Sequence, residues 1–138
     1  MIAETCLALA IYWEARNQPL QGKLAVAEVV LHRAHSELFP NDVCSVVYQG
    51  LHRYSTPVRN RCQFSWYCDG KSDYPEDYLS WIEAVRLARI SLKVYPYTFT
   101  NLPHNTYYFH SIKKKRNSFF RKKFFVSRIG DHLFYIED

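Results

Sequence analysis

The sequence predicts a mainly helical α+β fold in a single domain spanning residues 1–138. Apolar residues recur at helical spacing in residues 2–36 and again from residue 75 to residue 92. After Pro96, β-branched and aromatic runs replace this spacing, which is typical of short strands. A chain of 138 residues that is 48% hydrophobic can build one core, and length gives no reason to expect two domains.

The first half of the chain predicts a helical hairpin. Residues 2–16 and about 20–36 form the two expected helices, separated by "NQP", with Pro19 near the first turn of the second, where its missing N–H costs little. The stretch "FPNDVCSVVYQG" predicts a turn followed by a short helix or strand. Residues 49–74 are rich in Arg, Ser, Gly, Cys and aromatics, so we expect a long irregular and functional region.

The second half predicts one more helix and then strands. "PEDYLSWIEAVRLARISL" has helical spacing, with Pro75, Glu76 and Asp77 suited to its first turn. "YTFT", "TYYFH" and "FFVSRIGDHLFYIE" predict short strands or extended segments, with a turn at Gly130 and Asp131.

The positive charge of the chain is concentrated in its second half. The net charge is +5, and the densest part, residues 113–128, holds eight positive charges and no acid. Such a run suits a polyanion, for example nucleic acid, anionic lipid or an anionic cell-wall polymer. A solvated basic face without a partner is the alternative.

The four cysteines do not form a disulfide scaffold in a chain of this length. Cys62 and Cys68 lie in one short segment, where an oxidising compartment could join them. Cys6 lies in the apolar first helix, where we expect a small buried hydrophobe. Zinc bound by Cys62, Cys68, His104 and His110 is a rival hypothesis, but the gap of five between the cysteines is outside the usual two to four. We predict no metal and no cofactor.

The N-terminus has an apolar centre like that of a secretion signal. It lacks a basic n-region, carries Glu4 and continues into a charged "EAR" without a small-residue cleavage site, so we interpret it as the first helix of the fold. No stretch approaches the roughly 18 apolar residues of a membrane span.

One carboxylate stands out in the first helix. Glu14 shares a helical face with Ala3, Leu7 and Ala10, so it lies last on an apolar stripe, at the edge of the core. Loss of hydration there raises a carboxyl pKa and lets the group hold a proton near neutral pH, as a general acid must. The alternative is an ordinary ion pair with a nearby arginine or a helix N-terminus.

Several motifs in a fixed order give the chain a resemblance to a known family. "LALAIYWEARNQPLQGKLAVAEVVLHR" is followed by "CQFSWYCDG", "YYFH" and "RIGDHLFY". Between about Leu7 and Tyr135 the chain therefore resembles the SleB/CwlJ-type cell-wall hydrolases, a family named for spore-cortex-lytic enzymes. The resemblance implies a compact, lysozyme-like domain.

The resemblance also implies a reaction. Enzymes of this type cut the β-1,4 bond between N-acetylmuramic acid and N-acetylglucosamine in peptidoglycan, and the family's catalytic Glu falls on Glu14. Members that are lytic transglycosylases leave a 1,6-anhydro ring. One carboxylate can serve this reaction, first as acid and then as base, whereas a glycosidase usually needs two.

Other matched positions are candidates for substrate binding: Gln63, Phe64, Ser65, Trp66, Tyr108 and His110. Amide and hydroxyl groups suit sugar hydroxyls and acetamides, and aromatic rings suit pyranose faces. The alternative is that the aromatics fill the core, Gln63 caps a turn and His110 is structural. We expect His132 to be structural as well.

The chain departs from the family pattern at three places. His32 and Arg33 replace the common Asn-Arg, Asn17 replaces a Gly after "EAR", and the basic run of residues 113–128 replaces a Trp-containing stretch. Glu28 lies among apolar residues of the second helix, and a position in the cleft would make it a second carboxylate.

Three alternatives follow from the sequence: a muramidase with a second carboxylate, a nucleic-acid-binding module that uses residues 113–128, and a non-catalytic wall-binding or virion protein. We expect a monomer that acts on peptidoglycan glycan strands and binds no specific nucleic acid. Residues 113–128 would contact an anionic envelope polymer or a membrane surface. We expect the protein to be made in the cytoplasm and released as a phage lysis protein or carried in a virion.

Overall fold

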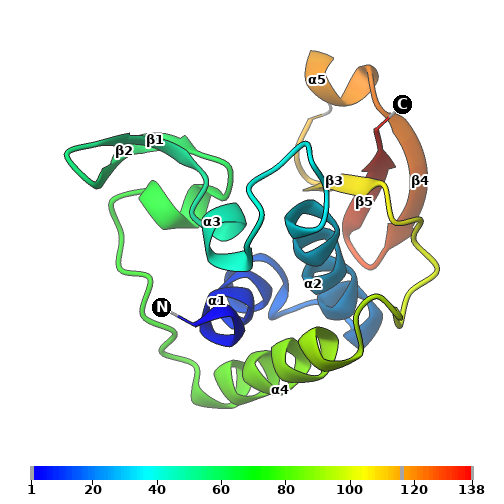
Figure 1. Cartoon of the computed structure of the whole chain (residues 1–138), viewed down its shortest axis with the longest axis horizontal. Coiled ribbons are helices and arrows are strands. Elements are labelled where there is room, and N and C mark those ends of the chain that lie inside the picture. The colour runs from blue at the N-terminus through cyan, green and yellow to red at the C-terminus, as the bar shows by residue number, and fades with distance from the viewer. Residues whose placement is uncertain (1, 116, 138) are drawn as a thin grey trace.

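The computed structural model describes residues 2–115 and 117–137 and has the expected mainly helical α+β fold (Figure 1). The helices are α1 (Ala3–Ala15), α2 (Leu20–Ala34), α3 (Val43–Val47), the 3-10 helix η1 (Ser65–Cys68), α4 (Tyr78–Val94) and α5 (Ser118–Arg121). The strands are β1 (Gly50–Arg53), β2 (Thr56–Cys62), β3 (Thr106–Ser111), β4 (Phe124–Ile129) and β5 (His132–Ile136).

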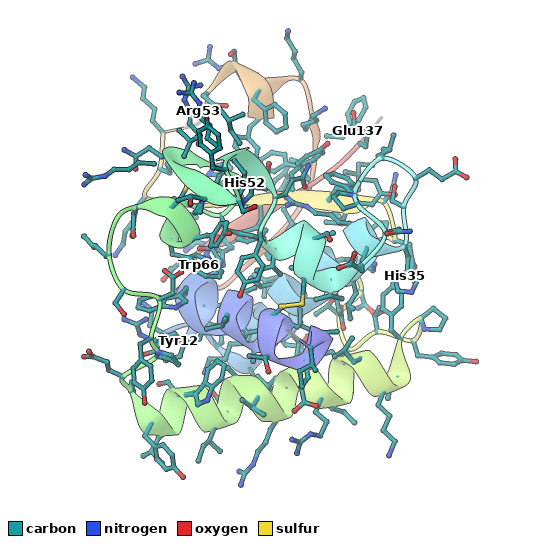
Figure 2. All side chains as sticks on the ribbon, turned by 60° about the vertical axis from the view of Figure 1, so that its left-hand side comes forward. Tyr12, His35, His52, Arg53, Trp66 and Glu137 are labelled. Carbon is teal, nitrogen blue, oxygen red and sulfur yellow. A yellow bond between two sulfur atoms is a disulfide. The ribbon has the colours of Figure 1, made fainter. Side chains whose placement is uncertain are left out.

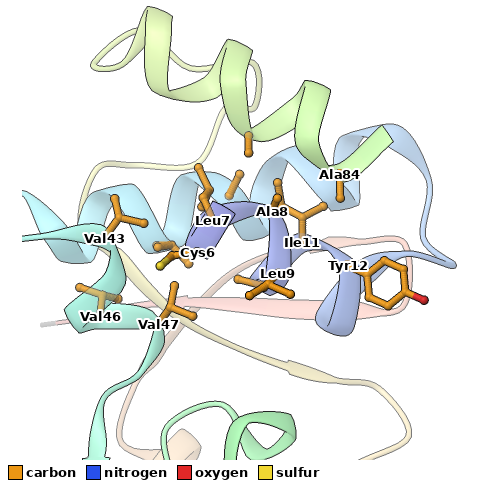
Figure 3. Close-up of a cluster of buried hydrophobic side chains, with 14 of the residues drawn as sticks. Cys6, Leu7, Ala8, Leu9, Ile11, Tyr12, Val43, Val46, Val47 and Ala84 are labelled. Carbon is orange, nitrogen blue, oxygen red and sulfur yellow. The ribbon is translucent and has the colours of Figure 1, made fainter. Parts of the chain in front are cut away.

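Helix α1 is the centre of the molecule. Every residue from Cys6 to Tyr12 is buried, with no more than 8% of any side chain exposed. The helix packs against α2, α3 and α4, and side chains from α3 and α4 surround it (Figure 3). A helix that is apolar on all sides is stable when it is enclosed, so α1 is fixed in position by its neighbours.

The N-terminus of α4 is tied to α1 by polar contacts. Asp77 caps α4 by accepting a hydrogen bond from the backbone N–H of Ser80 at 3.3 Å, and the backbone N–H of Asp77 donates to the Tyr12 hydroxyl at 3.0 Å. The sequence had suggested that Asp77 belongs to the first turn of this helix. It is instead the N-cap residue.

The chain forms two antiparallel sheets. Strands β1 and β2 make a hairpin, and β3, β5 and β4 make a three-stranded sheet with β5 in the middle. The three-stranded sheet packs on α2, where Phe134 contacts Ala25 and Val29 in a small second core. In Figure 1 the hairpin and this sheet lie on opposite sides of the helices.

The turn between β4 and β5 docks against the connection from α1 to α2. Gly130 adopts a φ of +58°, and a Cβ there would come within 2.5 Å of the Gln18 Oε1 atom. The backbone N–H of Asp131 donates to that same oxygen at 2.8 Å. The predicted Gly130–Asp131 turn is confirmed, and it requires glycine because a side chain would push the sheet away from α1.

Two expectations for segments outside the long helices are wrong in part. Residues 49–74, which were expected to be irregular, contain the β1–β2 hairpin and η1. The "YTFT" segment is not a strand, because the backbone N–H groups of Phe99 and Thr100 donate to the Glu28 carboxylate. In the described residues, no helix has the length and apolar character needed to cross a membrane.

Two disulfides join all four cysteines. Cys62 bonds to Cys68, as the spacing had suggested, and Cys6 bonds to Cys44 of α3. Cys6 is fully buried as expected, but its disulfide was not predicted, since Cys44 lies 38 residues away. The zinc hypothesis is wrong because both thiols of its Cys pair are used in a disulfide.

We predict that the Cys6–Cys44 disulfide stabilises the fold more than the Cys62–Cys68 disulfide. Closing 38 residues restricts the unfolded chain by about 4 kcal/mol, against about 2 kcal/mol for a closure of six residues. Urea unfolding of the Cys6→Ala/Cys44→Ala and Cys62→Ala/Cys68→Ala double variants measures the two losses. An equal or reversed order would contradict this prediction.

Candidate active site

The end of α1 opens into a cleft of about 770 Å³. One wall comes from β2 and η1, and the other comes from β3, the segment before α5 and the β4–β5 turn. The lining residues are Glu14, Asn17, Gln18, Asn60, Cys62, Gln63, Ser65, Phe109, His110, Ser111, Lys113, Lys114, Asn117, Phe119, Phe120, Asp131 and His132. The cleft therefore runs between the hairpin and the three-stranded sheet, with the last turn of α1 at its floor.

Glu14 is the carboxylate on this floor. Burial raises its pKa from the usual 4.5 to about 7, because the charged form loses hydration. The positive charges of Lys114 and Arg33 act in the opposite direction and favour the carboxylate. Glu14 can therefore hold a proton near neutral pH and release it without a large change in pH.

Arg33 is a buried cation behind the cleft. It is 2% exposed, its Nε donates to the Tyr107 carbonyl at 2.7 Å, and its guanidinium lies over the rings of Phe39 and Phe64 at 5.2 and 5.5 Å. Burial lowers its pKa to about 10, and Glu14 is one of the groups that raise it. No Arg33 ion pair with a carboxylate occurs within residues 2–115 and 117–137, so its field reaches Glu14.

The "QFSW" motif alternates between cleft and core. Gln63 and Ser65 are exposed and line the cleft, whereas Phe64 and Trp66 are 3% and 6% exposed and belong to the core. The expectation that the Phe64 and Trp66 rings face the substrate in this cleft is not met. The Phe64 ring is buried because it packs against the Arg33 guanidinium and the Phe109 ring.

The two candidates from β3 differ in position. Tyr108 does not line the cleft: its ring contacts the Phe119 ring and the Lys123 ammonium, and its hydroxyl hydrogen bonds to Glu137. His110 lines the cleft but is 7% exposed.

Both ring nitrogens of His110 have partners, which gives it a structural function. Nδ1 lies 2.9 Å from the Ser111 carbonyl and therefore donates to it, which leaves Nε2 to accept from the Tyr135 hydroxyl at 2.8 Å. The ring also stacks on Tyr135, with centroids 5.3 Å apart. These contacts join β3 to β5 beside the cleft.

Several cleft residues were missed by the sequence analysis. Four side-chain amides, of Asn17, Gln18, Asn60 and Asn117, line the cleft, and none of them belongs to a motif that marks sugar binding. Asp131 also lines it, although the "GDH" motif had drawn attention to His132 alone.

Glu28 is not a second carboxylate of the cleft. It is 2% exposed, and it accepts hydrogen bonds from the backbone N–H groups of Phe99 and Thr100 at 2.6 and 3.3 Å. Glu28 therefore holds residues 98–100 against α2 and does not line the cleft. The carboxylates that line the cleft are Glu14 and Asp131.

The basic segment 113–128 does not form one free surface. Lys113 and Lys114 line the cleft, and the Lys123 ammonium forms an ion pair with Glu137 at 2.8 Å. Arg128 lies 3.8 Å from Asp131 and donates to the Gly130 carbonyl. Arg116, part of the same segment, lies outside the described residues. The segment thus contributes positive charge to the cleft.

A family model described as Cell Wall Hydrolase matches residues 17–135. The chain belongs to the cell wall hydrolase family. The resemblance that the motifs had indicated is thereby confirmed, and the match covers most of the chain. Glu14 lies three residues before the matched range, so its place in this family's chemistry depends on the neighbouring motif and on the geometry of the cleft.

Two solved structures share the fold. The catalytic domain of the germination-specific lytic transglycosylase SleB from Bacillus anthracis aligns with a TM-score of 0.68 and 24% identity, over 96% of this chain and 93% of that domain. The catalytic domain of Bacillus cereus SleB aligns with a TM-score of 0.67 and 23% identity, over 96% of this chain and 88% of that chain. The expected lysozyme-like α+β class is confirmed by these likenesses.

Curated relatives match over shorter stretches. The spore cortex-lytic enzyme of Bacillus subtilis (strain 168) is 49% identical over 45 residues, 33% of this chain and 15% of that protein. The spore cortex-lytic enzyme of Oceanobacillus iheyensis is 46% identical over 43 residues, which are 31% of this chain and 16% of that protein. The matched region thus spans less than a fifth of the length of these relatives.

We predict that Glu14 lowers stability as it ionises. Its pKa rises from 4.5 in an unfolded chain to about 7 in the folded protein, so the folded state is favoured by protonation and loses stability as pH rises from 4.5 to above 7. Glu14→Gln removes this loss. At pH 8.5 the free energy of unfolding of the variant should exceed that of the native protein by about 2–3 kcal/mol, and at pH 4.5 the two should differ little.

Urea unfolding at both pH values measures this difference. Glu37→Gln, which removes an exposed carboxylate outside the cleft, is the matched control. A gain from Glu14→Gln that is the same at both pH values would contradict the prediction.

Proposed function

We propose that this protein cleaves the β-1,4 bond between N-acetylmuramic acid and N-acetylglucosamine in peptidoglycan, as a lytic transglycosylase. The observation that carries the proposal is Glu14, a carboxyl group with a pKa of about 7 on the floor of an open cleft, in a chain of the cell wall hydrolase family. The likeness to a lytic transglycosylase domain supports the choice of reaction.

In the first step Glu14 acts as a general acid. Its proton passes to the glycosidic oxygen as the bond to the muramic C1 breaks, so the departing sugar leaves as an alcohol. The Glu14 carboxylate that remains is stabilised by the nearby charges of Lys114 and Arg33. The muramic residue develops oxocarbenium character, which its own N-acetyl oxygen can stabilise.

In the second step Glu14 acts as a general base. The muramic 6-hydroxyl attacks C1, and its proton returns to the Glu14 carboxylate, which regenerates the acid. The product is a 1,6-anhydro ring, and no water is consumed. A base of pKa near 7 suits this step because it can be ionised and reprotonated within one cycle.

The polar residues of the cleft would orient the glycan. The amides of Asn17, Asn60 and Gln63 and the hydroxyl of Ser65 can bind sugar hydroxyls and acetamides. Phe119 and Phe120 are the aromatic rings that line the cleft from the side of α5. They replace Phe64 and Trp66 as candidates for stacking on the sugar.

Hydrolysis by a muramidase is the second candidate, and Asp131 favours it. This carboxylate lines the same cleft from the β4–β5 turn and could activate a water molecule. Two observations weigh against it: Asp131 already accepts from the Gln18 amide at 3.3 Å, and the charges that act on Glu14 are both cations.

We predict that purified protein releases anhydro-muropeptides from peptidoglycan sacculi and that Glu14→Gln releases none, because an amide cannot donate the proton. Mass spectrometry of the soluble fragments distinguishes the two reactions, since the anhydro product is one water lighter. Asp131→Asn should keep most of the activity and give the same products. Reducing-end muramic acid that depends on Asp131 would establish the muramidase instead.

We also predict a pH dependence set by Glu14. Because the first step needs its proton, kcat/KM should fall about tenfold for each pH unit above 7. Arg33→Met removes a cation that favours the carboxylate, so this fall should begin at a higher pH. Initial rates of sacculus clearing between pH 5 and 9 measure both profiles, and a decline at the same pH in the two proteins would contradict the assignment.

A further inference from the structure

A second pocket of about 400 Å³ lies next to the cleft and is not used by the proposed reaction. Its walls are the last turns of α1, η1 and the segment that leads into α4. Trp13 lines this pocket and Glu14 lines the cleft; Trp66 lines the pocket and Ser65 lines the cleft. The two sites are therefore one residue apart on both α1 and η1.

Aromatic rings form the inner wall of this pocket. Tyr12, Trp13 and Trp66 line it, and the Trp13 and Trp66 rings are stacked with centroids 6.5 Å apart. Tyr12 and Trp66 lie on the same side of the molecule in Figure 2. Trp66 is 6% exposed, and its indole N–H has no hydrogen-bond partner within the described residues. The wall thus offers apolar faces and a buried donor that is not satisfied.

The pocket carries negative charge in a protein whose net charge is +5. Its acids are Asp69, Asp73, Glu76 and Asp77, and its bases are Arg16 and Lys71, which leaves four minus two, or two negative charges in excess. Arg16 is already placed over the Tyr12 and Trp13 rings, at 4.6 and 5.1 Å.

Asp73 and Glu76 are the pocket acids whose side chains have no hydrogen bond or ion pair to a described residue, and Asp73 is the half-buried one of the two. Asp77 caps α4, and Asp69 accepts from the backbone N–H of Lys71 at 2.9 Å. The Asp73 side chain is half-buried and has no hydrogen bond or ion pair to any described residue, while its carbonyl accepts from the Trp13 indole at 2.9 Å. Burial and the charge of Asp69 raise the pKa of Asp73, so a cation placed there would relieve an unfavourable pair.

The arrangement favours an organic cation over a metal ion. Across the described residues, no group of three or more His, Cys, Asp or Glu side chains is placed to bind a metal. The acids are spread along a pocket that is large enough for an aliphatic chain, and its aromatic wall suits the methylene groups of such a chain.

We propose that this pocket binds a primary ammonium group on a peptide branch of the glycan strand, with the ammonium beside Asp69 and Asp73. The identity of the ligand rests on the proposed function, because peptidoglycan carries peptides with free amines next to the bond that is cut. Binding such a branch would select the strand register in which the scissile bond lies over Glu14.

Tryptophan fluorescence tests the pocket directly, since Trp13 and Trp66 line it. The probes are the tripeptide N-acetyl-Ala-Glu-Lys and the same peptide with an acetylated lysine side chain. We expect saturable binding of the first peptide and binding at least about tenfold weaker for the second. Asp73→Asn should weaken binding of the first peptide by about tenfold, whereas Glu37→Gln should leave it unchanged.

Three results would overturn the proposal: no binding of the lysine peptide, equal binding of both peptides, or equal affinity of Asp73→Asn and the native protein. Unfolding curves of Asp73→Asn verify that the variant is folded, which we expect because the carboxylate has no hydrogen bond or ion pair to a described residue and the backbone carbonyl that binds Trp13 is unchanged.

Cleavage of native sacculi and of sacculi with acetylated amines separates this proposal from the proposed function. Acetylation should raise KM by about tenfold for the native protein and leave kcat unchanged. The Asp73→Asn variant should cut native and acetylated sacculi with the same KM. If neither substrate is cut, the proposed reaction fails, and the peptide titration still decides whether the pocket binds an ammonium group.

Discussion

The enclosure of α1 is the constraint on which the rest of the structure depends. Neighbouring helices cover it on every side, and the disulfide from Cys6 to Cys44 ties it to α3. Glu14 stands where this apolar helix meets the cleft, so the packing that stabilises the core also removes water from one carboxyl group. The fold thereby gives Glu14 a pKa of about 7, and the folded protein is less stable when Glu14 is ionised.

Two cations of different accessibility limit this effect. Lys114 comes from the segment after β3, at the cleft surface, and Arg33 comes from α2, beneath it. Arg33 is held by the Tyr107 carbonyl and by aromatic faces instead of a carboxylate. Its charge is therefore not neutralised by a fixed partner and is available when Glu14 ionises, a change that occurs within the proposed reaction.

Helices α1, α2 and α4 could be predicted from sequence because apolar residues at helical spacing are a local signal. The β1–β2 hairpin could not, since every residue of β1 is exposed and no alternation marks it. The Cys6–Cys44 disulfide and the burial of Phe64 depend on contacts between distant segments. Glu14 could be singled out from its position on an apolar face, which is a local signal, together with the resemblance carried by its "EAR" motif, whereas Asp131 reaches the cleft through a turn that docks on Gln18.

Helix η1 lines both the cleft and the second pocket. Its disulfide to β2 fixes a four-residue helix in which Ser65 faces a cleft where two lysines are balanced by Glu14 and Asp131, and Trp66 faces a pocket with an excess of acids. A polymer whose branches carry ammonium groups matches the excess of acids in the pocket, and a neutral glycan alone does not account for it. The excess of acids in the pocket next to the cleft therefore favours a substrate that the protein binds through its peptide as well as through its sugar.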